Sequence, residues 1–383
     1  MSRLSLRRAF CLGAGRDTLR DVIVDGEHVC DRCASGGEPS EIDLDGMTLL
    51  PAFVNAHDVL DTSVLPALGH PPYRSLYEWV NASQAAISEL GATLAMPLAD
   101  RLFLGGMRNL LAGVASVLHQ HPDHRSLARS DFPVRVQRRY GFAHSPGLTP
   151  ALRLTYRTSD RRIPWIVRAA EGSDPDLREE LALLAAANVL RHNTVLAHGT
   201  ALEAEDGPRL AAAGASLAWC PESDLWLYGR TAPFAGLRAA GVRVGLGSDG
   251  APAGARDFLS SLAVARAESG LDVRSMVDLA TIASAEVARM PVGGFTDGAP
   301  ADLVATRSLE RLLAGDRTAV ALLIVRGSVV YGEPQLVAAS GAASFPLSVD
   351  GAPRSLAAGL GRRLASLLRG RRHGARWLAG VAL

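Results

Sequence analysis

Three short apolar runs, TVLAH (194–198), SLAWC (216–220) and VRVGLGSD (242–249), define the central part of this sequence. Each run has the length of a buried strand and ends in a polar or reactive residue. Between the first two lies an Ala- and Leu-rich segment that predicts a helix over 206–213, ending at Gly214. Strands that alternate with helices predict βα units with a parallel sheet.

The same rhythm extends on both sides of this stretch. Further buried runs cover 48–57, 113–121, 134–144 and 165–171, and a helix is predicted from Asp174 to Val189. We place an eighth strand between Ser145 and Ile163. The repetition predicts an α/β fold, a (β/α)8 TIM barrel.

Strand-like segments also occupy both ends of the chain, at 21–25 and 41–45 and again at 301–305, 320–325 and 328–331. They predict a small β-sandwich domain built from both termini. The expected organisation is therefore residues 1–50 for the first part of this domain, 51–299 for the barrel, 300–345 for the second part, and 346–383 for a basic C-terminal tail or docked helix. Its leucines 356, 360, 364, 367 and 368 fall at helical spacing. The basic face of this segment is either solvated or in contact with an anionic surface.

Composition limits the classes of function. The chain has 383 residues, 48% apolar and 21% charged, with a net charge of +1, which is typical of a globular protein that does not bind nucleic acid. All 40 basic residues are arginines, so lysine chemistry is excluded. Four cysteines are too few for a disulfide framework, and no apolar run is long enough for a membrane span. We expect a cytoplasmic protein.

Polar side chains gather where the predicted strands end. They are His57-Asp58, His119 and His121, His144, Arg168 and Glu171, His198, and Asp249. Catalytic residues of (β/α)8 barrels lie at the C-terminal ends of the strands. Histidines and carboxylates at one rim therefore predict an active site there.

Five motifs resemble the metal-dependent amidohydrolase superfamily, most closely the branch of cytosine deaminases and chlorohydrolases. They are MTLLPAFVNAH (47–57), VLAHG (195–199), WCPESD (219–224), GLGSDG (245–250) and GAPADLV (298–304). Their order holds over residues 43–305. The resemblance implies hydrolysis of a C–N bond in a small polar substrate. A zinc or iron ion would be held by His-x-His on the first strand, a His on the fifth and an Asp on the eighth.

Two of these four ligand positions carry residues without a lone pair to donate. The first-strand motif reads His57-Asp58-Val59, and the fifth-strand motif reads Arg168-Ala-Ala-Glu171. By resemblance, His57 and Asp249 remain as metal ligands if a metal is retained. Glu171, His198 and Asp249 are the predicted catalytic residues, and Arg168, His121 and His144 are predicted to bind substrate.

Loss of a metal would leave buried carboxylates without a compensating charge. We therefore expect Arg168 to fill the metal position and to pair with Asp249 or Glu171. Replacement ligands also have to be considered. His119 and His121 share one face of a strand, and His124, His144 and Asp58 are further donors.

Three functions remain open. The first is a C–N hydrolase with a reduced or relocated metal site. The second is a metal-free, inactive protein that binds a small molecule or assists a partner. The third is a metal-free enzyme in which Arg168 is the electrophile. We expect no cofactor, or zinc or iron if a residual metal site survives. By analogy with relatives of this fold, the protein can be a homo-oligomer.

Overall fold

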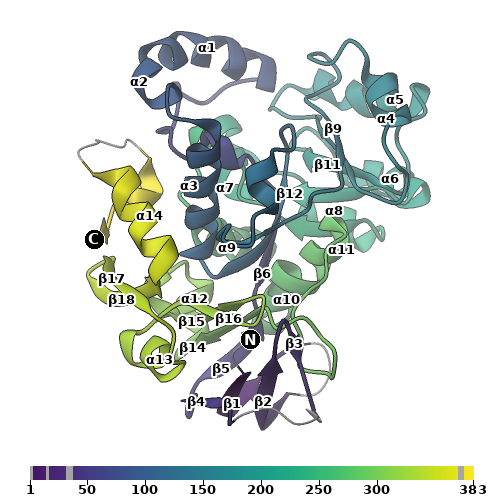
Figure 1. The fold of residues 1–383 in the computed structure, drawn as a ribbon. Coiled ribbons are helices and arrows are strands. Elements are labelled where there is room, and N and C mark those ends of the chain that lie inside the picture. Colours follow the sequence, from purple (N-terminus) through teal and green to yellow (C-terminus); the bar gives the residue numbers. More distant parts are fainter. Residues whose placement is uncertain (1–2, 14–16, 32–37, 370–374) are drawn as a thin grey trace.

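A computed structural model describes residues 3–13, 17–31, 38–369 and 375–383 (Figure 1). Its central part is an α/β unit with two parallel sheets. The three-stranded sheet contains β6 (Phe53–Asp58), β7 (Val114–His119) and β8 (Arg135–Val136). The five-stranded sheet contains β9 (Gly141–Ala143), β10 (Trp165–Ala169), β11 (Thr194–His198), β12 (Ser216–Trp219) and β13 (Arg243–Leu246). The parallel α/β architecture predicted from the sequence is confirmed.

Hydrogen bonds join the ends of these two sheets. The amides of Ser248 and Asp249, just beyond β13, both donate to the His57 carbonyl at the end of β6, at 3.0 Å each. The Gln120 side chain, just beyond β7, donates to the Ala143 carbonyl at the end of β9 at 2.9 Å. The polar residues at the carboxyl ends of the strands are thereby held on one side of the unit.

The predicted eighth strand between Ser145 and Ile163 is wrong. The structure has the helix α4 (Leu152–Arg157) there and describes no strand in that segment. The predicted run 134–144 instead forms two strands, β8 and β9. Its middle, Gln137-Arg138-Arg139, places polar and charged side chains at consecutive positions, which breaks the apolar run.

Helices connect the strands. They are α1 (Leu76–Glu89), α2 (Gly91–Leu94), α3 (Leu98–Leu110), α5 (Glu179–Ala186), α6 (Gly207–Ala213), α7 (Pro221–Tyr228), α8 (Phe234–Ala239), α9 (Phe258–Ser269), α10 (Val273–Asp278) and α11 (Ser284–Ala288). The predicted helix 206–213 corresponds to α6, and Gly214 ends it with φ 68°. The helix predicted from Asp174 to Val189 begins as a 3-10 turn at Pro175–Arg178 and ends earlier, at Ala186.

Both termini contribute to one eleven-stranded sheet, with the order β19-β17-β18-β16-β15-β14-β5-β1-β2-β3 and with β4 beside β1. The strands are β1 (Arg3–Cys11), β2 (Thr18–Asp25), β3 (His28–Val29), β4 (Ser40–Asp43), β5 (Thr48–Pro51), β14 (Leu303–Thr306), β15 (Val320–Val325), β16 (Ser328–Gly332), β17 (Ser344–Val349), β18 (Ala352–Ala357) and β19 (Val381–Ala382). Figure 1 shows the purple N-terminal strands and the yellow-green C-terminal strands at the same end of the molecule. Two further helices, α12 (Leu309–Leu313) and α13 (Pro334–Ala339), lie among the C-terminal strands.

The last segment is more ordered than a tail. Residues 344–357 form the hairpin β17–β18, and the helix α14 (Ala358–Leu368) follows. Leu360 and Leu364 bury one face of α14, whereas Leu356 belongs to β18, so the helical spacing predicted from 356 begins too early. Trp377 is buried, and its indole donates to the Ser63 carbonyl at 2.7 Å. The C-terminal segment therefore packs on the α/β unit.

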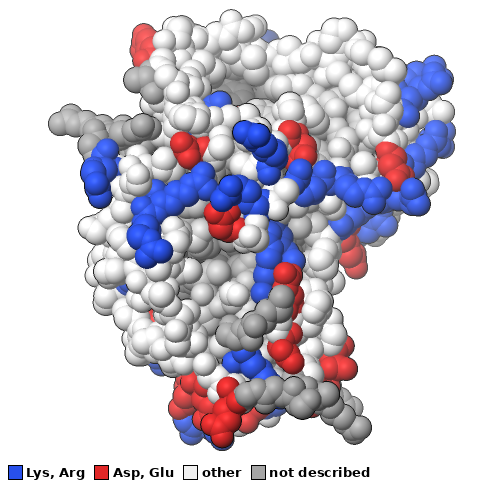
Figure 2. Space-filling model, viewed as in Figure 1, with Lys and Arg blue, Asp and Glu red and all other residues white. Residues whose placement is uncertain are grey.

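Two surface features bear on function. In the part of the chain that the structure describes, no helix has the length and apolar character to cross a bilayer. On the face seen in Figure 2, basic side chains form a band across the molecule, and acidic side chains lie beside several of them.

Candidate functional site

Strand ends bring the predicted site residues together. Arg168 lies on β10, and β10 and β11 pair so that Ala169 stands opposite His198. His57 lies next to the end of β6 in the three-stranded sheet, and its carbonyl accepts the main-chain amide of Asp249. The side chains of all four residues are almost completely buried.

The backbone at these strand ends is strained. His198 has φ 71°, Asp249 φ 55° and Ala170 φ 50°, all in the left-handed region that residues other than glycine rarely adopt. Such conformations persist where the surrounding structure enforces them, and they cluster at functional sites.

Arg168 bridges two carboxylates. Its Nε and Nη2 donate to the two oxygens of Glu171, at 2.7 Å each. Its Nη1 and Nη2 donate to the two oxygens of Asp249, at 3.3 and 3.2 Å. The sequence predicted a pairing with Asp249 or Glu171, and the structure has both.

This pairing dominates the electrostatics of the site. Burial is the largest single influence and raises the pKa of both carboxyl groups, but the charges of Arg168 and His198 and the hydrogen bonds together outweigh it. The pKa of Asp249 therefore lies well below its usual range, and the pKa of Glu171 lies below its usual value. Both carboxylates are therefore charged at neutral pH.

His198 has an acidic partner of its own. Its Nδ1 lies 2.6 Å from Oδ1 of Asp224, and its Nε2 lies 3.5 Å from Asp249 Oδ2 and 3.9 Å from Glu171 Oε1. Burial lowers the pKa of the imidazole, but the carboxylates, with Glu171 the largest contribution, raise it above its usual value. Thr231 donates to the other oxygen of Asp224 at 2.9 Å and so holds that carboxylate in place.

His57 has fewer hydrogen-bond partners than His198. Its Nε2 lies 3.5 Å from Asp249 Oδ1, and neither ring nitrogen has a hydrogen-bond partner among the described residues. Burial lowers the pKa of the ring. Its ring meets that of His198 edge to face, with 5.4 Å between centroids. Among the described residues, His57, His198 and Cys220 bring their ligand atoms within 4.8 Å of one another.

A cavity of about 260 Å³ opens beside this cluster. Its lining includes the charged or imidazole side chains of Arg168, Asp249, His121 and His144 and the polar residues Thr62, Ser83 and Gln84. Val59, Leu65, Leu68, Trp79, Val80 and Ile87 contribute much of its apolar wall. The Arg168 guanidinium lies 5.9 Å from the centre of the Trp79 ring. The three residues predicted to bind substrate thus line one cavity, while the predicted catalytic residues Glu171 and His198 lie behind it.

The two cavity histidines differ. His121 Nδ1 lies 2.8 Å from Asp61 Oδ1. Burial and the Arg168 charge lower the pKa of His144 to about 4, so its ring is neutral at pH 7.

His119, His124 and Asp58, the other candidate donors, have partners elsewhere. The Nδ1 of His119 accepts the Leu60 amide, and His124 caps a 3-10 turn. Asp58 points away from His57, as strand alternation predicts, and meets Arg108 and Asn109.

Two residues that bond to the predicted site residues were not anticipated from the sequence. Tyr228 donates to Glu171 Oε1 at 2.6 Å, and Arg108 donates to the Asp249 carbonyl at 2.8 Å. Tyr228 follows Asp224 by four residues on α7, which puts both on one face of the helix, and this spacing was the available signal. Arg108 lies on α3, a segment for which no element was predicted, and no local sequence pattern connects it to residue 249.

Comparison with known proteins adds a family to this geometry. Residues 164–333 match the amidohydrolase family. Over 126 residues the chain is 35% identical to a 5-methylthioadenosine/S-adenosylhomocysteine deaminase from Haloquadratum walsbyi. This alignment covers 30% of this chain and 28% of the relative. A protein of the same name from Teredinibacter turnerae is 32% identical over 139 residues, 33% of this chain and 31% of the relative. The matched stretch is thus less than a third of each relative's length.

Solved structures agree in fold. Atrazine chlorohydrolase from Arthrobacter aurescens, complexed with zinc, superposes with a TM-score of 0.68 at 18% identity, over 85% of this chain and 95% of that one. An adenosine deaminase from Xanthomonas campestris with bound zinc gives 0.67 at 18% identity, over 86% and 92%. These similarities place the α/β unit in the TIM-barrel-like class. Together with the family match over residues 164–333 and the ordered strand-end motifs, they are consistent with the metal-dependent amidohydrolase superfamily.

Proposed function

We propose that this protein binds a neutral small molecule in the cavity beside Arg168 and does not hydrolyse it. The observation that carries the proposal is the position of Arg168 between Glu171 and Asp249, with four hydrogen bonds to their carboxylates. A fixed organic cation there compensates the charges that a metal ion would otherwise compensate.

The donor set argues against a resident metal. A protein zinc site uses at least three ligand atoms with free lone pairs. Both oxygens of Asp249 face Arg168, and burial raises the pKa of the Cys220 thiol well above its usual value, which disfavours the thiolate that would bind. The imidazoles of His57 and His198 remain, and two nitrogens do not complete a site. The residues present therefore do not fit the zinc or iron site that the resemblance implies.

The cavity lining supports a neutral ligand with an apolar face. A guanidinium has five N–H groups, and four hydrogen bonds from Arg168 already go to carboxylates. One N–H group of Nη1 remains free to donate to a ligand. A single N–H group cannot form the bidentate pair that an anionic ligand would need. Trp79 and neutral His144 offer ring faces beside it. The relatives' names point to nucleoside-like compounds, so an uncharged nucleoside is the proposed ligand class.

A second candidate is a C–N hydrolase of the deaminase kind that retains a metal. The unpartnered ring nitrogens of His57 and of His198 Nε2, with Cys220 close by, favour it. In that case Glu171, His198 and Asp249 would be the proton-handling residues predicted from the sequence.

Metal analysis combined with binding separates the two. We expect purified protein to hold far less than one equivalent of zinc or iron, to bind an uncharged nucleoside such as 5′-methylthioadenosine in calorimetry, and to release no ammonia from it. About one equivalent of tightly held metal with ammonia release would establish the hydrolase instead. Absence of binding across a panel of nucleosides would overturn the ligand class.

Restoring the two missing donors tests the role of Arg168 directly. The double variant V59H/R168H should take up zinc, whereas each single variant should take up much less. Equal zinc uptake by the wild-type chain would contradict the proposal that Arg168 replaces the ion.

We also propose that the two parallel sheets form one (β/α)8 barrel over residues 51–299. The eleven-stranded sheet would then form the separate β-sandwich domain, built from residues 1–50 and 300–345 and, beyond the predicted bound, from β17, β18 and β19. The bonds from Ser248 and Asp249 to the His57 carbonyl support closure of the barrel.

A further inference from the structure

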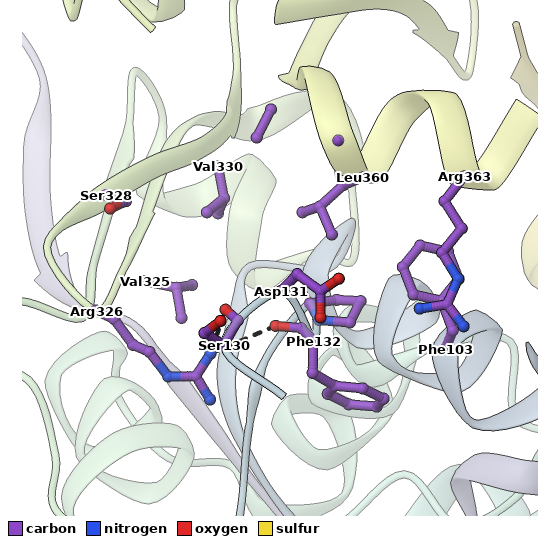
Figure 3. Close-up of a pocket in the computed structure, with 13 residues that line it drawn as sticks. Phe103, Ser130, Asp131, Phe132, Val325, Arg326, Ser328, Val330, Leu360 and Arg363 are labelled. Carbon is purple, nitrogen blue, oxygen red and sulfur yellow. Dashed lines mark hydrogen bonds between the residues drawn. The ribbon is translucent and has the colours of Figure 1, made fainter. Parts of the chain in front are cut away.

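A second cavity has a volume of about 290 Å³. Its walls come from the start of α14, the turn between β15 and β16, and the loop before β8. Figure 3 shows Arg326 and Arg363 at opposite ends of this cavity, with Leu360 and Arg363 projecting from α14. None of its lining residues belongs to the Arg168 cavity.

Arg326 is a cation without a direct counter-ion. Among the residues that the structure describes, no carboxylate forms an ion pair with its guanidinium. Its nitrogens reach only the carbonyls of Ser130, Phe132 and Val134, at 3.4 to 3.5 Å, the outer limit of hydrogen bonding. Burial and the Arg135 charge lower its pKa.

Carboxylates near Arg326 are bound elsewhere. Arg135 holds Asp302 at 2.7 Å and Glu27 at 2.8 Å, and Asp302 also accepts the Arg326 main-chain amide. These bonds leave the guanidinium itself facing the cavity and three weakly held carbonyls. A carboxylate that binds this half-buried guanidinium would form charge-assisted hydrogen bonds. These are stronger than the present long bonds to neutral carbonyls.

The other charges that line the cavity are already paired. Arg363 donates to Asp100 at 3.1 Å and lies over the Phe103 ring at 4.1 Å. Asp131 accepts two bonds from Arg129, at 2.7 and 2.8 Å. Asp131 remains negative and would repel a second negative charge on a ligand.

The rest of the lining is small or apolar. Val325, Val330, Leu360 and Phe132 provide apolar surface, and Ser130 and Ser328 provide hydroxyl groups. A Cβ atom at Gly359 would have no atom within 4 Å, so the space beside this lining residue is open.

We propose that this cavity binds a small organic monocarboxylate, whose carboxylate pairs with Arg326 and whose apolar body packs on Val325, Val330 and Leu360. A single unpaired guanidinium next to Asp131 favours one negative charge over the two of a phosphate monoester. The apolar wall favours a short aliphatic or aromatic body over a bare inorganic ion.

The test measures binding of hexanoate, phenylacetate, hexanamide and inorganic phosphate by ligand-observed NMR and calorimetry on the full chain. Hexanoate or phenylacetate should bind the wild-type protein, and hexanamide and phosphate should bind at least roughly tenfold more weakly, because each lacks either the charge or the apolar body. R326Q should weaken carboxylate binding by a similar factor.

Variants of Gly359 keep the test independent of any folding defect in R326Q. G359F should block carboxylate binding by filling the cavity, whereas G359A should keep it. V80W, which narrows the Arg168 cavity, should leave carboxylate binding unchanged. Equal binding of hexanoate and hexanamide, no binding by either acid, or full binding by G359F would each overturn the proposal.

Discussion

At the scale of single residues, the site depends on the charge of Arg168. Two buried carboxylates share its guanidinium, and each is 1% exposed. Removing one partner of such a buried pair costs more than the pair contributes, because the remaining charges stay desolvated. The free energy of unfolding should therefore respond strongly to this position.

R168M, which keeps the length and removes the charge, should lower the free energy of unfolding by about 3–5 kcal/mol at pH 7. The lowered pKa values of Asp249 and Glu171 stabilise the wild type above the unfolded pKa of about 4, and this stabilisation is lost as pH falls through the folded values. The difference in unfolding free energy between wild type and R168M should become smaller below about pH 4. Urea titrations at pH 7 and pH 3.5 measure this difference. A difference that does not change with pH would contradict the role of Arg168 in lowering the two pKa values.

His198 offers a second test at this scale. Its pKa is raised, so its stabilising contribution is present below about pH 6.5 and is lost as pH rises through the folded pKa. D224N keeps an oxygen for Nδ1 but removes the Asp224 charge, so the pKa of His198 should fall. An NMR titration of the imidazole checks this, and T231V, which leaves the Asp224 charge in place, is the control. An unchanged His198 pKa in D224N would refute the role given to Asp224.

At the scale of elements, two glycines of α14 stand in opposite environments. A Cβ on Gly361 would lie 2.3 Å from Phe345 Cβ on β17, whereas a Cβ on Gly359 meets nothing within 4 Å. At Gly361 the helix therefore approaches β17 too closely to leave room for a side chain.

This contrast gives a matched pair of variants. G359A should stabilise the protein by up to about 1 kcal/mol, because alanine is the better helix former. G361A should destabilise it despite the same gain in propensity, because β17 must move. Chemical denaturation of both variants checks this, and stabilisation by G361A would show that α14 does not dock as described.

At the scale of the whole molecule, the C-terminal segment supports the loops around the Arg168 cavity. Trp377 donates to the Ser63 carbonyl, and Arg376 donates to the Gly254 carbonyl. Ser63 and Gly254 are next in sequence to Thr62 and Ala253, which line that cavity. Residues at the end of the chain therefore help to shape the site.

W377A should cost about 3–5 kcal/mol of unfolding free energy, as burial of a large aromatic side chain predicts, and W377F should cost less. Hydrogen exchange should become faster in residues 60–65 and 251–254 in W377A. Stability loss without faster exchange in these loops would mean that the segment stabilises the fold but not the cavity.

Local sequence patterns were enough to predict several elements and the polar residues that follow them. Apolar runs, a C-capping glycine and ordered motifs are local properties, so β10 to β13 and α6 could be predicted, as could the positions of Glu171, His198 and Asp249 at or just beyond strand ends. Which side chains meet became clear only in the folded molecule. Arg168 reaches both carboxylates, Cys220 joins two histidines, Tyr228 bonds Glu171, and residues 344–357 extend the terminal sheet, because contacts across many residues depend on how the elements pack and not on the pattern within any one of them.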